Sequence, residues 1–379
     1  MGKRANGEGS IYPRADGKWC AAIVADDPAT GRRRRTVLYG KTRTEVRLKL
    51  KAATERAETG GPVRDAKATL AAWLTQWRKT TLAASNRKES TRELYASLSG
   101  SHLEPAPFGA IPLDRLRPSD VDALILALRA KHLADSTIRS TFTVLRLALG
   151  DAVRDGLIAK NPAAAVKRPA VTLTEARHLS PAEVRTLLAA AEGSRYHAML
   201  SLIAATGLRR GEAAALTWSD VDLAAGTLRV RGTLARIGGE LKVTEPKTTK
   251  SRRTLPLSPA LIAMLKAHRK QQAAERLHAG SEWAGASHVF MTEAGRPVEP
   301  RNILRALSSA AETVGLSGVG VHTLRHSAAT QWLENGIHLK AVSDLLGHGD
   351  ISITADIYGH VSEETSRAAI AGLSDAIGL

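Results

Sequence analysis

The sequence predicts a multidomain protein that is mainly α-helical and carries small β-sheets. Three observations support this fold class. The 379 residues are enough for two or three domains. Apolar residues make up 43% of the chain and charged residues 24%, which are the proportions of a globular protein with a substantial core. Aromatic residues are scarce at 4%, whereas Ala and Leu, which are strong helix formers, are plentiful.

The net charge of +17 and an isoelectric point near 10.3 predict an acidic partner. Nucleic acid is the first expectation and an anionic membrane surface is the second. The N-terminal residues lack the apolar segment of a signal peptide, and the chain has no run of about 18 apolar residues. We therefore expect double-stranded DNA as the partner and no membrane. The single cysteine, Cys20, allows neither an internal disulfide nor a Cys-based zinc site, which fits a reducing cytoplasm.

The first predicted domain, residues 1–62, is a small β-rich module. Its expected elements are strands at residues 9–12, 18–24 and 35–40 and a helix at residues 44–58. Asp16-Gly17 is a tight-turn signal between the first two strands. A run of four arginines opens the third strand: Arg32, Arg33, Arg34 and Arg35. This run is either a solvated turn or a contact to DNA phosphates, with a strand face in the major groove.

The second predicted domain, residues 67–166, follows the linker Gly60-Gly61-Pro62 and contains about four helices. Apolar residues recur at helical spacing along three stretches and should face one core. These residues are Leu70, Trp73, Leu74 and Trp77, then Val121, Leu124, Ile125 and Leu128, and finally Ile138, Phe142, Leu145 and Leu149. Pro118 and Asp135 mark the starts of the second and third of these helices.

Lys167 and Arg168 belong to a basic, proline-marked linker before the third domain. Such a linker lies along a phosphate backbone or acts as a flexible hinge. Residues 1–60 hold 14 Lys and Arg against 7 Asp and Glu, residues 67–170 hold 16 against 9, and residues 171–379 hold 23 against 20. Most of the excess positive charge therefore lies in the first two segments. We interpret them as DNA-gripping modules and the last segment as the place of the chemistry.

The third predicted domain, residues 172–379, begins with a helix-capping signature. Ser180 is the expected N-cap, a proline follows it, and Glu183 stands at the third helical position. Residues 206–212 predict a helix end, a glycine turn and a new helix. An arginine at a helix N-terminus makes an anion site. Taken alone, however, Arg209 is equally well explained as a surface residue after a glycine cap.

Four motifs follow one another in this domain. They are T-G-x-R-x-x-E at residues 206–212, H-x-x-R-H at residues 322–326, L-G-H at residues 346–348, and Tyr358, ten residues after the last histidine. In this order they resemble the tyrosine recombinase (phage integrase) family, and the resemblance covers nearly all of the third domain. The first domain is similar to the three-stranded arm-binding domains of some phage and mobile-element integrases. The second is similar in pattern to the family's helical core-binding domain.

The residue types in these motifs suit the cleavage of a phosphodiester. Two arginines, Arg209 and Arg325, can fork onto the non-bridging oxygens and stabilise the charge of the transition state. The resemblance makes Tyr358 the nucleophile. Its phosphodiester keeps the energy of the cleaved bond, so neither a metal nor another cofactor is expected. Because the unperturbed pKa of tyrosine is about 10, a base or positive surroundings must help Tyr358 to ionise.

The resemblance implies further roles. His322 is the general base, His348 hydrogen-bonds the phosphate, and Glu212 orients the arginine site. Arg210 is expected to be a surface or DNA-backbone residue.

The family's general acid is a lysine from a β-hairpin loop. We expect residues 228–230 and 241–243 to be the strands of that hairpin. Counting back from a further strand expected at residues 253–257, the family's lysine falls on Lys247, and Lys250 is its rival.

Each of these residues has a plainer interpretation. Tyr358 could be a packed aromatic residue, and His322 could cap a helix. His322 and His326 have the i, i+4 spacing of zinc ligands, but no acidic third ligand stands beside them and Arg325 would repel the cation. The ordered combination of motifs favours the recombinase. His360 has no assigned role.

The resemblance implies a recombinase that integrates or excises a phage or similar mobile element. The expected intermediates are a 3′-phosphotyrosyl adduct and a Holliday junction, with a homo-tetramer assembled on specific attachment sites. Accessory DNA-bending proteins or an excisionase are further expected partners, at the nucleoid of a bacterial or phage-infected cell. A type IB topoisomerase and a non-catalytic DNA-binding regulator are the alternatives. The helix after Tyr358 packs on its own domain or docks on a neighbouring protomer, through Ala368, Ala369, Ile370, Leu373 and Ile377.

Overall fold

The computed structural model describes residues 10–26, 33–58, 68–172, 177–245, 251–349, 351, 367, 370, 371 and 374. The chain divides into two compact units, Met1–Leu173 and Thr174–Leu379. Within the described residues, no helix combines the length and apolar character that crossing a bilayer requires.

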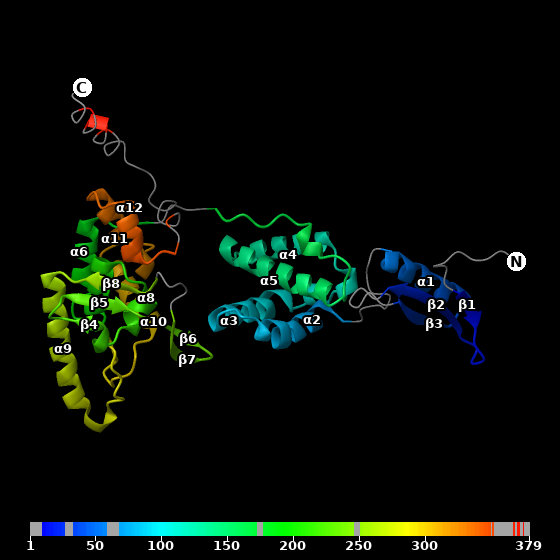
Figure 1. The fold of residues 1–379 in the computed structure, drawn as a ribbon, viewed down its shortest axis with the longest axis horizontal. Coiled ribbons are helices and arrows are strands. Elements are labelled where there is room, and N and C mark those ends of the chain that lie inside the picture. The colour runs from blue at the N-terminus through cyan, green and yellow to red at the C-terminus, as the bar shows by residue number, and fades with distance from the viewer. Residues whose placement is uncertain are drawn as a thin grey trace. The chain divides into compact units, whose positions relative to one another are not determined.

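The N-terminal part of the first unit is an antiparallel sheet covered on one face by a helix (Figure 1). The strands are β1 (Ser10–Pro13), β2 (Trp19–Asp26) and β3 (Arg33–Gly40), in that order, and the helix is α1 (Arg43–Glu58). Strand alternation places Ala21 and Ile23 on the same face of β2, and both are buried, as is Val46 of α1. The three strands and the helix that the sequence predicts are thus present.

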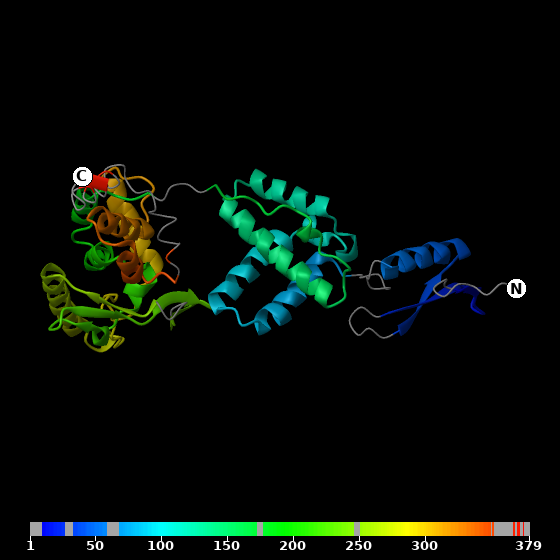
Figure 2. The same ribbon diagram turned by 45° about the horizontal axis from the view of Figure 1, so that its top comes forward.

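The rest of the first unit is helical. Its elements are α2 (Leu70–Trp77), α3 (Glu89–Leu98), α4 (Pro118–Ala130) and α5 (Asp135–Arg154), with the π-helical turns η1 (Arg78–Leu82) and η2 (Ser99–Leu103) after α2 and α3. Helix α5 contacts α2, α3 and α4, and these helices form one bundle (Figure 2). All twelve apolar residues predicted to face the core are buried. The indole N–H groups of Trp73 and Trp77 donate to the Ala148 carbonyl (3.0 Å) and to Asp151 Oδ2 (2.7 Å), which ties α2 to α5.

The second unit has its own core, built from helices and a small sheet. The helices are α6 (Pro181–Ala190), α7 (His197–Thr206), α8 (Arg210–Ala215), α9 (Pro259–Ala279), α10 (Pro300–Thr313), α11 (Val321–Glu334) and α12 (Leu339–Leu346). The sheet has the order β4 (Val221–Asp222), β5 (Thr227–Val230), β8 (Arg253–Pro256). Ser180 caps α6 with Glu183 in a capping box, as predicted.

The predicted pairing of residues 228–230 with 241–243 is wrong. Leu228 of β5 pairs with Leu255 of β8, so the first run belongs to the three-stranded sheet. The second run lies in β7 (Glu240–Thr244), which forms a separate hairpin with β6 (Thr233–Ile237). A two-residue turn joins β6 to β7, and such short loops are the commonest hairpin connections. The nearer partner strand, β6, therefore takes the place that the prediction gave to β5.

Candidate active site

Arg209 stands at the junction of α7 and α8. Helix α7 ends at Thr206 and is capped by Gly207, whose φ of 63° lies in the left-handed region that favours glycine. A Cβ atom on Gly207 would also lie 2.8 Å from a methyl carbon of Leu346, so a larger residue would require the Leu346 side chain to shift. The sequence predicted this helix end, glycine turn and new helix. The turn brings Arg209 next to the C-terminal end of α12.

Glu212 is the carboxylate at the centre of the site, and its side chain is only 3% exposed. It accepts hydrogen bonds from the backbone N–H of Arg209 (2.9 Å) and from Nη1 of the same residue (2.8 Å). On the other side it accepts from Nη2 of Arg253 (3.0 Å). Burial raises the pKa of the Glu212 carboxyl, but the hydrogen bond and charge of Arg253, together with Arg209, outweigh burial and lower the pKa overall. Glu212 is therefore an ionised support for two arginines.

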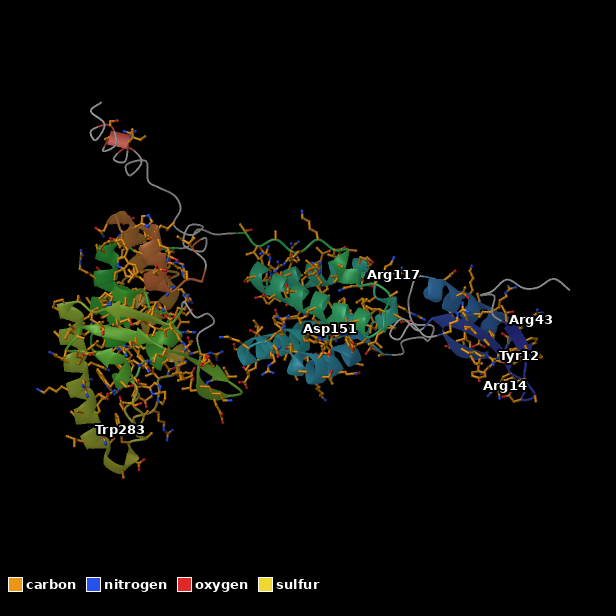
Figure 3. All side chains as sticks on the ribbon, viewed as in Figure 1. Tyr12, Arg14, Arg43, Arg117, Asp151 and Trp283 are labelled. Atoms are coloured by element: carbon orange, nitrogen blue, oxygen red, sulfur yellow. The ribbon has the colours of Figure 1, made fainter. Side chains whose placement is uncertain are left out.

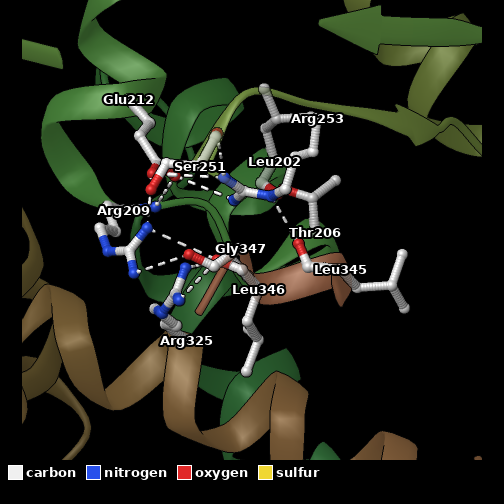
Figure 4. Close-up of polar contacts among 11 residues, drawn as sticks. Leu202, Thr206, Arg209, Glu212, Ser251, Arg253, Arg325, Leu345, Leu346 and Gly347 are labelled. Carbon is white, nitrogen blue, oxygen red and sulfur yellow. Dashed lines mark hydrogen bonds and ion pairs between the residues drawn. The ribbon is translucent and has the colours of Figure 1, made fainter. Parts of the chain in front are cut away.

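Arg325 projects from α11 and is 4% exposed. Its Nη1 donates to the Gly207 carbonyl (2.6 Å), and its Nη2 donates to the Leu346 carbonyl (2.8 Å). Arg209 reaches the same Leu346 oxygen from its Nη1, at 3.5 Å. The two guanidinium groups therefore lie side by side, as Figure 4 shows. Arg209 and Arg253 share the Glu212 carboxylate, and Arg325 adds a third guanidinium beside Arg209, so the site has an excess of positive charge suited to an anion.

His348 follows the end of α12 in a Schellman motif. The N–H of Gly347 donates to the Asp344 carbonyl and that of His348 to the Ser343 carbonyl, both at 3.1 Å. Burial, followed by the charges of Arg325 and neighbouring basic groups, lowers the pKa of His348 to about 4. The ring is therefore neutral at pH 7. A neutral imidazole can still donate one hydrogen bond to a phosphate oxygen.

His322 and His326 lie on α11, one turn apart. Partial burial lowers the pKa of His322, and Arg325, Arg210 and Arg209 lower it further, in that order. Burial and the charge of His322 likewise lower the pKa of His326. A neutral His322 is able to accept a proton. In the portion of the chain that the structure describes, no three His, Cys, Asp or Glu side chains gather as metal ligands would.

The structure does not describe several of the predicted site residues. Lys247, Lys250, Tyr358 and His360 lie outside the described residues, as does Arg32. The side chain of Arg34 also lies outside the description. The residues that the structure brings together are Arg209, Glu212, Arg325 and His348, with His322 on the same helix as Arg325.

Arg253 is the site residue that sequence reasoning missed. It is the first residue of β8, and its side chain is 6% exposed. A signal was available, since Arg253 stands two residues before the buried Leu255 and therefore on the same side of the strand. A charged residue in phase with a buried leucine implies a buried partner.

The other predicted DNA contacts are exposed or half-buried. Lys167 and Arg168 are exposed in the linker, which is held to α5 by a hydrogen bond from Arg139 Nε to the Pro169 carbonyl (2.9 Å). Arg210 is half-buried at the start of α8.

The free face of the N-terminal sheet is both aromatic and basic. Strand register places Tyr12 and Tyr39 on either side of Cys20, and both tyrosines are exposed, at 39% and 49%. The same face carries Arg35, which pairs with Val24 in register and is also exposed. The guanidinium of Arg14 lies 5.2 Å from the ring centre of Tyr39, and Figure 3 labels Tyr12 and Arg14 on this module. This face opposes the one that α1 covers.

Comparisons with known proteins identify the family of this chain. Residues 177–365 match the phage integrase family. A XerC-like tyrosine recombinase of Caldanaerobacter subterraneus subsp. tengcongensis is 30% identical over 359 residues, covering 90% of this chain and 92% of the relative. An integrase of Streptomyces ambofaciens is 29% identical, with coverages of 94% and 93%. The chain therefore belongs to the phage integrase family, the family of tyrosine-type site-specific DNA recombinases.

Solved structures show the same fold. A fragment of the integrase of transposon Tn1549, solved in complex with a circular intermediate DNA, matches with a TM-score of 0.67 at 21% identity. The match covers 80% of this chain and 99% of the solved fragment. The lambda integrase tetramer bound to a Holliday junction has a TM-score of 0.60 at 22% identity, with coverages of 95% and 99%. The predicted fold class, mainly helical with small sheets, is confirmed.

Proposed function

We propose that this protein cuts and rejoins double-stranded DNA at specific attachment sites and thereby integrates or excises a phage or similar mobile element. The observation that carries the proposal is the meeting of Arg209 and Arg325 at the Leu346 carbonyl, beside a neutral His348. Two adjacent guanidiniums present the forked donors that bind the non-bridging oxygens of a phosphodiester. They stabilise the charge that develops on those oxygens in the transition state.

The proposed reaction begins with Tyr358. Its phenolic oxygen loses a proton to neutral His322 and attacks the phosphorus, forming a 3′-phosphotyrosyl bond while the bond to the 5′-oxygen breaks. Lys247 gives its proton to the departing 5′-oxygen, and Lys250 is its rival for this role. His348 donates a hydrogen bond to the phosphate. A 5′-hydroxyl from the partner strand then reverses the step, which rejoins the DNA through a Holliday junction without ATP.

We assign the three parts of the chain as an arm-binding domain (1–62), a core-binding domain (67–166) and a catalytic domain (172–379). The helical part of the first unit and the second unit each have a hydrophobic core of their own. This supports separate roles for the core-binding and the catalytic domain. The exposed Tyr and Arg side chains on the N-terminal sheet suit contacts to a groove and its phosphates. Lys167, Arg168 and Arg210 are assigned to phosphate contacts.

A tetramer on two DNA sites is the proposed assembly. The lambda integrase solved on a Holliday junction is a tetramer, and this chain shares its fold. Ile370, one of the apolar residues beyond Tyr358, is 68% exposed in the single chain, which suits docking on a neighbouring protomer. An accessory DNA-bending protein or an excisionase would complete an assembly at the bacterial nucleoid.

The arm-binding role predicts a change in salt dependence. Replacing both Arg33 and Arg35 with Ala should weaken binding to duplex DNA that flanks the crossover site. The logarithm of the association constant falls linearly with the logarithm of the salt concentration. In the double variant this slope should become shallower by about two, because each lost phosphate contact removes nearly one released counterion. Fluorescence anisotropy across a salt series measures both effects. Lys51→Ala, a change at an exposed cation on α1 that pairs with Glu55, is the matched control and should leave the slope unchanged. An unaltered slope in the double variant would remove these arginines from the interface.

A plasmid assay tests the proposed function against its alternatives. Candidate attachment sites come from the DNA that flanks the gene, because an integrated element lies beside its own junctions. A supercoiled plasmid with two such sites should yield recombinant circles, whereas a plasmid without them should stay supercoiled. Relaxation of the plasmid that lacks sites would indicate a type IB topoisomerase. Binding without recombination, relaxation or a covalent adduct would indicate a non-catalytic regulator.

A further inference from the structure

Arg253 connects three parts of the second unit that are separate in sequence. Its guanidinium forks onto the Glu212 carboxylate, with Nη2 to Oε2 at 3.0 Å and Nη1 to Oε1 at 3.3 Å. Its Nε donates to the Leu345 carbonyl at 2.6 Å, and its Nη1 also lies 3.3 Å from the Ser251 carbonyl. These contacts link the start of β8, helix α8 and the end of α12.

The end of α12 packs directly on this guanidinium. A Cβ atom on Gly347 would lie 2.9 Å from Nη1 of Arg253 and 3.2 Å from its Cδ, so a larger residue would have to displace the Arg253 side chain. Gly347 also has a φ of 66°, which its place in the Schellman motif requires. The position of His348, the next residue, is therefore set by the side chain of Arg253 as well as by α12.

Two of the groups that Arg253 holds, Glu212 and the Leu345 carbonyl, are linked to residues proposed to act on the phosphate. Glu212 accepts hydrogen bonds from Arg209 at 2.8 and 2.9 Å. Leu345 precedes the Leu346 carbonyl that accepts from Arg325 and from Arg209. Moving the guanidinium of Arg253 would thus shift the supports of both arginines at once.

We infer that Arg253 is a positioning residue for DNA cleavage: it locks Glu212 and the end of α12 in one arrangement, and so sets where Arg209, Arg325 and His348 meet the phosphate. This inference rests on the proposed function. A lysine cannot replace the arginine, because one ammonium cannot fork onto a carboxylate and also hold a carbonyl on its far side. The Arg253→Lys variant therefore keeps the positive charge at this position but loses the forked geometry.

The charged groups around His348 give a second readout. Arg325 and His326 face it from α11, Arg209 faces it from the start of α8, and Arg253 faces it from β8. All four lower the pKa of His348, after burial. Removal of the charge at position 253 should therefore raise the pKa of His348 above about 4, whereas a lysine there should keep most of the depression.

The test compares Arg253→Lys, Arg253→Met and the control Arg252→Met in the full chain. Arg252 is the neighbouring arginine, but its side chain is 56% exposed and pairs with the exposed Glu245. We expect Arg253→Lys to bind the duplex with wild-type affinity and to cleave a nicked suicide substrate about 100-fold more slowly in a single turnover, as a misplaced catalytic group would. Arg253→Met should cleave no faster and should show a raised His348 pKa in ring NMR titrations. Arg252→Met should match the wild type in every measurement.

Two results would overturn the inference. One is wild-type cleavage by Arg253→Lys, which would show that the forked geometry is not needed. The other is a His348 pKa that stays at about 4 in a folded Arg253→Met protein. The NMR titration needs no DNA, so it remains informative even if the wild-type protein forms no covalent adduct and the proposed function fails. If Arg253→Met does not fold, the lysine variant alone decides through its cleavage rate.

Discussion

Replacing Arg325 with Ala should slow DNA cleavage by about 1000-fold while leaving the affinity for duplex DNA within about threefold. Loss of one preorganised donor to a developing oxyanion costs about 100- to 1000-fold in rate, and Arg325 offers a fork of such donors in a buried setting. The side chain is 4% exposed and holds two backbone carbonyls, so its contribution to the ground-state grip on DNA is small. Single-turnover cleavage of a nicked suicide duplex gives the rate, and fluorescence anisotropy gives the affinity.

Arg209→Ala is the second variant of this experiment. The side chain of Arg209 is 33% exposed, so its removal should disturb packing less than the removal of Arg325. This variant should show the same loss of rate with retained binding. The control is Arg305→Ala, which removes an exposed arginine of α10. Loss of binding equal to the loss of cleavage would mean that the two arginines grip DNA and do not act on the transition state.

Tyr358→Phe should abolish the covalent protein–DNA adduct, with cleavage reduced by at least about 10⁴-fold. The variant keeps the aromatic ring for packing but has no oxygen to attack phosphorus. Denaturing gels detect the adduct of the wild-type protein on a nicked suicide substrate, and mass spectrometry of a protease digest identifies the modified peptide. We expect the nucleotide on the peptide that contains Tyr358. An adduct formed by the Phe variant would remove this residue from its role.

The helices of the first unit were predictable because local rules and tertiary packing agree there. Apolar spacing predicted the buried faces of α2, α4 and α5, since each helix presents one stripe to a single core. The break at Gly207 was equally visible, because few residues other than glycine adopt its backbone conformation. Local chemistry was sufficient in both cases.

The strand pairings of the second unit were not predictable in the same way. The runs around Leu228 and Val243 both suit strands, but each has a different partner. β-pairing depends on which strands meet in space, and the alternating pattern of a strand does not name its neighbour. The prediction passed over β6, the nearest candidate in sequence.

For the part of the candidate site that the structure describes, the sequence predicted most of the residues but not the network of contacts that joins them. The ordered motifs identified Arg209, Arg325 and His348, and the structure places all three at the end of α12. Glu212 belongs to the first motif and was predicted to orient the arginine site, but its buried partner Arg253 escaped prediction because it stands on β8, outside all the motifs. Breaking one partner of such a buried pair costs about 3–5 kcal/mol, which makes it a substantial part of the site's rigidity.

The most direct test of the account replaces the scissile phosphate with a methylphosphonate, which removes the charge from a non-bridging oxygen. If Arg209 and Arg325 act by stabilising that charge, their Ala variants should lose little on the neutral substrate, and their deficit should shrink from about 1000-fold to less than about tenfold. A deficit of equal size on the charged and the neutral substrates would contradict the account, because the two guanidiniums would then not be acting on the phosphate.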